Sequence, residues 1–172
     1  VAYTLLCNHI PLRSKVISAH NHESHYVFDM IYNNESTIYP EVITGDMHSI
    51  NKANFATLYW FDILFNPRFT NLAAEIKKVG CTKDSDAYAN FLIKPMDKID
   101  IDLIRSEWNN IRRIMVTLAQ KETTQHILIK KLCTYSYSNK TRKALFEFDK
   151  LIRSIYTLKY TMDQKLQQDV HR

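Results

Sequence analysis

Residues 40–69 read PEVITGDMHSINKANFATLYWFDILFNPRF, and the order of patterns in this stretch decides the fold class. Glu41–Thr44 is a short run with β-branched residues that starts directly after a proline, which is typical of a strand. Asn51–Phe61 has apolar residues at helical spacing. Ile63–Phe65 predicts a second strand, which Pro67 ends. The stretch therefore predicts a strand–helix–strand unit.

The segments before this unit also alternate between strand and helix patterns. Val1–Leu6 and Lys15–Ala19 are β-prone, and we expect a turn around Pro11 to separate them. Ser24–Tyr32 has apolar residues at positions 27, 28, 31 and 32, a helical spacing. The resulting order of strand, strand, helix, strand, helix, strand predicts an α/β domain, in which helices flank a central sheet.

The chain becomes helical after this α/β part. Leu72–Val79 predicts a helix that Gly80 closes at its C-cap, and the polar segment Cys81–Lys98 is expected to be a connecting loop. Beyond it, apolar residues at spacings of 4, 3, 4 and 3 predict a long amphipathic helix; they are Ile104, Trp108, Ile111, Met115 and Leu118. No glycine or proline follows Pro95 to break the helices from within.

Three more helices are expected in the last fifty residues. The first starts at Thr123 or Thr124, the second near Lys140 or Thr141, and the third has Asp163 as its N-cap. We therefore expect two parts, an α/β part over residues 1–98 and an all-helical part over residues 99–172.

The composition excludes several classes of protein. The 172 residues include 2 glycines, where average usage would give roughly 12. Glycine-rich phosphate loops of the dinucleotide-binding and P-loop kinds are therefore excluded. The 3 cysteines have no CxxC spacing, which favours a reducing cytoplasm over a disulfide framework. No apolar run reaches the roughly 18 residues of a membrane span, and no signal peptide is visible.

Positive charge is concentrated in the second part of the chain. Residues 1–100 carry 9 Lys and Arg against 11 Asp and Glu, a net of −2, whereas residues 101–172 carry 14 against 7, a net of +7. The two values sum to the formal charge of +5. A basic segment of this kind is expected either to bind a polyanion or to form an ordinary solvated surface.

Two groups of residues could carry chemistry. Asp46 follows a predicted strand, and reactive groups collect beyond the carboxyl ends of strands in open α/β sheets. The alternative is that Asp46 caps the following helix or turn. His20, His22 and His25 form an H-x-H-x-x-H cluster that lacks a second group of zinc ligands, so a polar loop is the simpler interpretation.

Several short motifs together resemble the catalytic core of the Tn3 family of bacterial replicative transposases. They are HESHYVFDMIYNN at residues 22–34, PEVITGDMHSINKANF at 40–55 and ILFNPRF at 63–69. The later run LIKPMDKIDIDLIRSEWNNIRRIMVTLAQKETTQ at 92–125 is similar at the L-x-K-P and E-W-x-x-I-x-R positions. The resemblance covers almost the whole chain, and the motifs occur in the expected order.

The resemblance implies an RNase H-like fold. Residues 1–98 would be a partial catalytic core, a mixed sheet with flanking helices, and residues 99–172 a basic helical insertion. The family holds two Mg²⁺ ions, about 4 Å apart, with an Asp, Asp, Glu triad, and uses them in an in-line displacement at phosphorus. The second aspartate of that triad falls on Asp46, which is thus the expected catalytic and metal-binding residue.

The other two acids of the triad have no counterpart in this sequence. The first aspartate belongs to an S-D-G-Q-like motif upstream, and the glutamate to an N-R-G-E-like motif downstream. A single carboxylate does not hold two Mg²⁺ ions, so we expect these residues alone to be catalytically incomplete. The family's T-D-T-x-G is here GDMHS, with both threonines and the glycine replaced.

Three further residues match family positions near the expected active face. His48, Arg68 and Lys94 are expected to contact DNA phosphates, with ion pairs or structural hydrogen bonds as the alternative. The expected partners are transposon ends and target DNA, in the bacterial cytoplasm and without a membrane, and the parent protein is expected to be oligomeric. The alternative functions are a non-enzymatic helical module that binds nucleic acid or acts as a scaffold, and a truncated product without activity.

Overall fold

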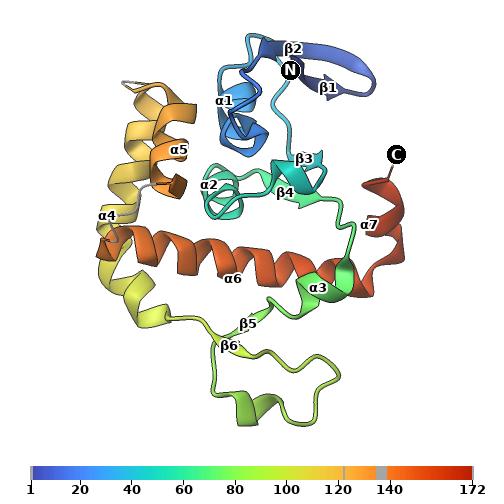
Figure 1. The fold of residues 1–172 in the computed structure, drawn as a ribbon, viewed down its shortest axis with the longest axis vertical. Helices are drawn as coiled ribbons and strands as arrows, with labels where there is room; N and C mark the ends of the chain where they lie inside the picture. The colour runs from blue at the N-terminus through green and yellow to red at the C-terminus, as the bar shows by residue number, and fades with distance from the viewer. Residues whose placement is uncertain (1, 122, 135–138, 172) are drawn as a thin grey trace.

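The computed structural model describes all residues except 1, 122, 135–138 and 172. The chain begins with an antiparallel hairpin of β1 (Ala2–Cys7) and β2 (Ile10–Val16) (Figure 1). Val1, which the sequence placed in the first strand, lies outside the described residues. The hairpin is fastened to the next helix by an ion pair of 2.5 Å between Lys15 of β2 and Asp29.

The second strand starts earlier than the sequence predicted. The chain turns at Asn8 and His9, whose φ angles of 48° and 66° lie in the left-handed region, and not at Pro11. Asparagine adopts this region more readily than most residues, so a tight turn is possible here without glycine. Pro11 lies within β2 beside a register shift, where the missing amide donor is tolerated. The predicted strand Lys15–Ala19 was therefore wrong in its position.

The strand–helix–strand unit predicted at residues 40–69 is confirmed. β3 (Val42–Gly45) and β4 (Leu64–Pro67) pair in parallel, and α2 (Asn54–Trp60) connects them. The helix expected at Ser24–Tyr32 forms as a 3₁₀ turn η1 (Glu23–His25) followed by α1 (Val27–Tyr32).

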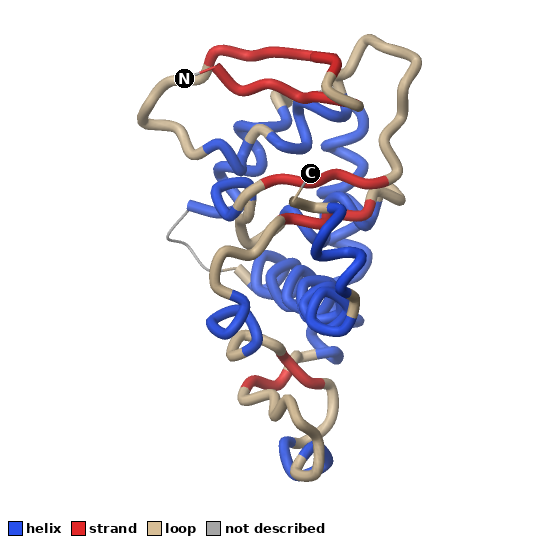
Figure 2. Tube along the Cα trace, turned by 90° about the vertical axis from the view of Figure 1, so that its right-hand side faces the viewer, coloured by secondary structure: helices blue, strands red, loops and turns tan. Residues whose placement is uncertain are grey.

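The strands form small, separate sheets. The hairpin, the β3–β4 pair and a third pair, β5 (Gly80–Cys81) with β6 (Asp97–Lys98), each have two strands in the part of the chain that the structure describes. Figure 2 shows the hairpin above the β3–β4 pair, with the β5–β6 pair far below both. The predicted mixed α/β class is confirmed, but the described strands do not join into one central sheet.

Gly80 does not have the helix C-cap role that the sequence predicted. The short helix α3 (Leu72–Ile76) ends with Lys77 as its C-cap, three residues before Gly80. A Cβ atom at Gly80 would lie 2.7 Å from Cγ1 of Ile99, closer than carbon atoms approach in proteins. Packing against the segment that leads into the next helix, and not helix termination, therefore excludes a side chain at this position.

The last part of the chain is helical, as predicted. It comprises α4 (Ile101–Gln120), α5 (Gln125–Thr134), α6 (Lys140–Met162) and α7 (Gln164–Asp169). The predicted N-cap is confirmed at Asp163, whose side chain accepts a 3.0 Å hydrogen bond from the Leu166 amide. None of the described helices is both long and apolar enough to cross a membrane.

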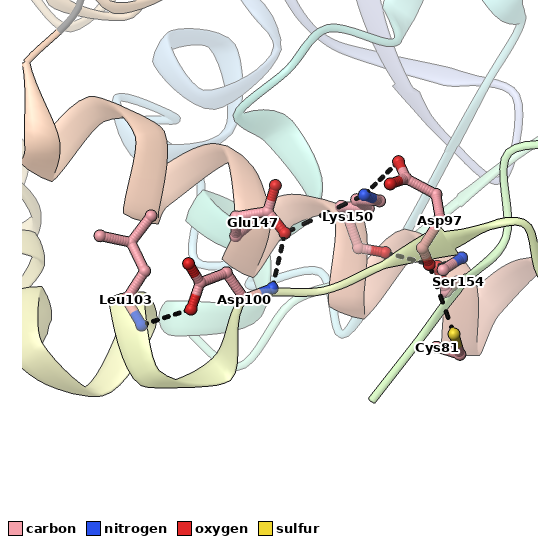
Figure 3. A network of polar contacts seen from close by, with 8 residues as sticks. Cys81, Asp97, Asp100, Leu103, Glu147, Lys150 and Ser154 are labelled. Atoms are coloured by element: carbon pink, nitrogen blue, oxygen red, sulfur yellow. Dashed lines mark hydrogen bonds and ion pairs between the residues drawn. The ribbon is translucent and has the colours of Figure 1, made fainter. Parts of the chain in front are cut away.

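Helix α6 crosses the molecule and binds the other elements together (Figure 1). It packs on α2 and α4, and one apolar core includes Phe55 of α2, Ile111 of α4 and Leu145 of α6, all almost completely buried. At one end its Glu147 accepts a 3.0 Å hydrogen bond from the Asp100 amide, and Lys150 pairs with Asp97 (Figure 3). These polar contacts fix the β5–β6 pair and the start of α4 against α6.

Candidate active site

Asp46 lies directly after β3, at the carboxyl end of the parallel β3–β4 pair, and is exposed. Its Oδ1 accepts a 2.9 Å hydrogen bond from the His48 amide, so it caps the 3₁₀ turn η2 (Met47–Ser49). The Ser49 hydroxyl donates a 2.5 Å hydrogen bond back to the Asp46 carbonyl. The capping role that the sequence offered as an alternative is therefore present, on a side chain that also faces solvent.

The turn after β3 requires glycine before Asp46. A Cβ atom at Gly45 would lie 2.6 Å from the Ser49 hydroxyl oxygen, so any larger residue would displace the turn. This close packing explains why one of the 2 glycines of the chain lies here. It holds the Asp46 backbone in one position at the edge of the sheet.

Two asparagines hold η2 against η1. Asn54 is completely buried at the start of α2, and its side-chain amide donates to the carbonyls of Ser24 at 2.9 Å and Ser49 at 2.7 Å. Asn51 also donates to the Ser24 carbonyl, at 3.0 Å, and its Oδ1 accepts from the Ala53 and Asn54 amides. The Asn51 side chain thus satisfies two amides at the start of α2, although the N-cap residue is Ala53. The link between the two turns was not predicted from the sequence.

Arg68 reaches the same edge of the sheet as Asp46. It follows β4, and its amide donates a 2.7 Å hydrogen bond to the Gly45 carbonyl. Because Gly45 and Pro67 are partners in the parallel register, the chain segments that carry Asp46 and Arg68 leave neighbouring strands at the same end. His48, exposed in η2, lies on this side as well. The structure thus brings three of the four predicted residues to one edge.

Lys94 lies elsewhere. It is exposed in the segment between β5 and β6, which both views place on the other side of α6 from the β3–β4 pair (Figures 1 and 2). The same chain of contacts that fixes β6 to α6 holds this segment away from the Asp46 edge. A DNA contact by Lys94 would therefore be separate from contacts near Asp46.

Tyr3 is a residue of this region that sequence reasoning missed. It lies half-buried on β1, and its pKa is raised to about 12 by burial first and then by the negative charges of Glu23 and Asp46. The phenol is therefore neutral at physiological pH and remains a hydrogen-bond donor. A single tyrosine in a strand pattern gives no signal of this neighbourhood, because the hairpin reaches Asp46 only in the folded chain.

Carboxylates are scarce around Asp46. Within the described residues, no group of three or more His, Cys, Asp or Glu side chains is placed to hold a metal ion. Two Mg²⁺ ions need several oxygen ligands from acidic side chains. The residues present therefore do not fit a two-metal centre by themselves, and Asp46 is one ligand of such a centre at most.

Comparison with known proteins gives one consistent result. A family model described as "Tn3 transposase DDE domain" matches residues 1–172. The chain is similar to the transposases for transposons Tn3926 and Tn21 of Escherichia coli, with 27% and 26% identity over 94% of its length. It is also similar to the transposase for Tn501 of Pseudomonas aeruginosa, with 23% identity. The chain spans 16% of the length of each of these relatives. No solved structure shows significant similarity.

Proposed function

Because this chain belongs to the Tn3 transposase DDE domain family, we propose that it forms part of the catalytic domain of a DNA transposase. The intact protein would cleave transposon ends and transfer the freed 3′-hydroxyl to target DNA, in the cytoplasm of a bacterium. The observation that carries this proposal is the exposed Asp46 carboxylate at the carboxyl end of β3. By the resemblance of the motifs, this residue would correspond to the family's second acid.

Each residue at this edge has a role in the proposal. Asp46 would provide one carboxylate of the metal centre, and His48 and Arg68 would contact phosphates of the DNA strand beside it. Lys94, on the far side of α6, would contact a different part of the DNA. Mg²⁺ would supply the charge that stabilises a displacement at phosphorus once further carboxylates complete its ligands.

The RNase H-like fold requires one continuous sheet, and the structure offers a place where it could be completed. Among the described residues, β1 pairs only with β2 and β3 only with β4, so each has one unpaired edge. A cavity of about 240 Å³ lies between them; its lining includes Tyr3–Leu6 of β1, Ile43 and Thr44 of β3, and Met30 of α1. We propose that a strand from outside these residues fills this space and joins the two pairs.

A cleavage assay tests the proposal. The chain of residues 1–172 is incubated with a transposon-end DNA duplex and Mg²⁺, and a longer protein with the flanking regions of the transposase is assayed in parallel. We expect nicking by the longer protein only, and we expect Asp46→Asn to reduce it to background. The reason is that the amide removes the negative charge that attracts the metal ion.

Asp62→Asn in the longer protein is the matched control. Asp62 is exposed in the turn before β4, at the opposite end of the same strand pair, and its φ of 58° suits asparagine as well. Full nicking activity of the Asp46→Asn variant would refute the role of Asp46 in the metal centre. Metal-dependent nicking by residues 1–172 that Asp46→Asn abolishes would refute catalytic incompleteness. DNA binding without cleavage by the longer protein would favour the non-enzymatic module.

A further inference from the structure

An open groove of about 600 Å³ lies beside the Asp46 turn and is bordered by positively charged and ionisable side chains. Its walls are formed by residues around η1, by the residues leading into α2, and by α5 and α6. The basic residues that line it are His20, His22, His25, Lys52, Lys130 and Arg153. No aspartate or glutamate belongs to the described lining. Charges of one sign along a concave wall attract ligands of the opposite sign, so the groove favours an anion.

His25 gives independent evidence for a missing ligand. The side chain lines the groove and is 7% exposed, yet its Nδ1 atom has no hydrogen-bond partner among the described residues. Arg153 of α6, which also lines the groove, binds Glu75 through Nη2 but leaves Nε without a partner. A buried polar atom without a partner costs about 1–3 kcal/mol. An anion in the groove would offer oxygen acceptors to both side chains.

A metal ion does not suit the groove, although three histidines lie there. The Nδ1 atom of His22 is already engaged by Ser24, whose amide donates to it at 3.3 Å and whose hydroxyl lies 2.8 Å away. The pKa of His25 is lowered by burial first and then by the positive charges of His22, Lys130 and His126. The cationic side chains of Lys52, Lys130 and Arg153, which share the lining, would repel a metal cation. Within the described residues, no metal-binding group of side chains is found.

The groove reaches the turn that follows Asp46. Met47, the residue after Asp46, lines it, and the buried Asn54 amide fixes η2 against η1. A ligand in the groove would therefore lie next to the acid at the end of β3. Lys52 and Lys130 are exposed on the two sides, where long flexible side chains can reach the oxygen atoms of a ligand.

We propose that this groove binds the phosphate groups of a DNA strand and guides that strand toward Asp46. The inference rests on the proposed function, since it is the DNA substrate that would supply the anion. Phosphate groups match the groove because they carry negative charge and several hydrogen-bond acceptors each. The groove offers cations and hydrogen-bond donors but no described acid that would repel a phosphate.

A binding experiment with charge reversals tests the inference. The affinity of residues 1–172 for a fluorescent DNA oligonucleotide is measured at several salt concentrations for Lys52→Glu, Lys130→Glu and Lys131→Glu. Lys131 is the control, because it is the next residue of α5 and is exposed, but does not line the groove. We expect each groove variant to weaken binding about tenfold and to lower the salt slope by about 1, with less than a threefold effect of Lys131→Glu.

A second measurement reports on the groove itself. Titration of the unsubstituted chain with the same oligonucleotide, followed by nuclear magnetic resonance, is expected to shift the His25 imidazole signals and leave those of His9 in the hairpin turn unchanged. Two results would overturn the inference that the groove binds DNA, and both would leave the proposed function intact. One is an equal loss of DNA affinity in all three charge variants. The other is a His25 signal that does not shift although the chain binds the oligonucleotide. Loss of DNA cleavage by the longer protein's Asp46→Asn variant is independent of either result.

Discussion

At the scale of single residues, Asp149 shows how a buried acid supports the site from a distance. It lies on α6 and is 3% exposed, and its Oδ1 accepts a 3.0 Å hydrogen bond from the Ala56 amide at the start of α2. The residue that precedes α2, Ala53, has no side chain that could cap the helix. Asn51 accepts from the Ala53 and Asn54 amides. Asp149 accepts from the Ala56 amide of the same first turn, so an acid on α6 helps to fix the helix that carries Asn54.

Asp149 also makes stability depend on pH. Burial raises its pKa from 3.8 to about 7, against the opposing effect of the Ala56 amide. Between these values the folded chain retains a proton that the unfolded chain has released, so the free energy of unfolding falls as pH rises from about 4 to 7. Above pH 7 the carboxyl is ionised in both states and its contribution no longer changes.

Asp149→Asn should remove this dependence. The amide oxygen can still accept from the Ala56 amide, but the side chain does not ionise. The free energy of unfolding of the variant, relative to that of the unsubstituted chain, should therefore rise by about 1–3 kcal/mol from pH 5 to pH 8. Chemical denaturation at the two pH values measures the difference. Asp149→Ala is the control for the cap and should lose about 1–2 kcal/mol at pH 5. The raised pKa would be refuted if the free energies of unfolding of Asp149→Asn and the unsubstituted chain differed by the same amount at both pH values.

At the scale of elements, close contacts between segments decide where glycine is needed. Gly80 begins β5, its amide donates a 2.9 Å hydrogen bond to the Ser154 hydroxyl of α6, and its Cα faces Ile99. The contact brings β5 against α6 and the start of α4. Neither partner is near Gly80 in sequence, so the need for glycine is set by packing.

Gly80→Ala should therefore destabilise the chain by about 1–3 kcal/mol, because the new methyl group overlaps the Ile99 side chain. Denaturant unfolding of Gly80→Ala, Ile99→Ala and the double variant measures the coupling. Ile99→Ala removes the clashing atom, so the double variant should lose clearly less than the sum of the single losses. Additive losses would show that the two residues do not clash.

At the scale of the whole molecule, residues 82–94 form a projection that contributes little to the core. None of these residues is buried, and Phe91 and Leu92 are 59% and 101% exposed. The segment extends below α6 in Figure 1 and is closed at its base by the short β5–β6 pair. The remainder of the chain is held by the core that α2, α4 and α6 share.

Limited proteolysis should consequently cut first within residues 82–94, because exposed segments without buried contacts adapt readily to a protease. Mass spectrometry of the early fragments identifies the site. The fluorescence of Trp60 and Trp108, whose rings lie 4.9 Å apart between α2 and α4, should persist after this first cut. A first cut in α4 or α6, or loss of the tryptophan signal together with it, would contradict this view of the molecule.

Much of the chain's order of elements could be predicted from sequence because it depends on local patterns. Alternation and turn residues predicted β3, α2 and β4, and the spacing of apolar residues predicted the long helices. The site was predicted in part, since a strand followed by an acid placed Asp46 at the end of β3. The hairpin turn at Asn8 and His9 was missed, because left-handed backbone there gives only a weak sequence signal.

The sequence by itself thus determined the mixed α/β class, the strand that directly precedes Asp46 and the family motifs. Only the tertiary structure decided that Arg68 leaves the sheet beside Asp46, that Lys94 lies beyond α6, and that the basic groove forms between α5 and η1. The physical reason is the distance along the chain over which each interaction acts. Hydrophobic spacing and helix caps act over a few residues, whereas the neighbours of a side chain depend on how distant elements pack around α6.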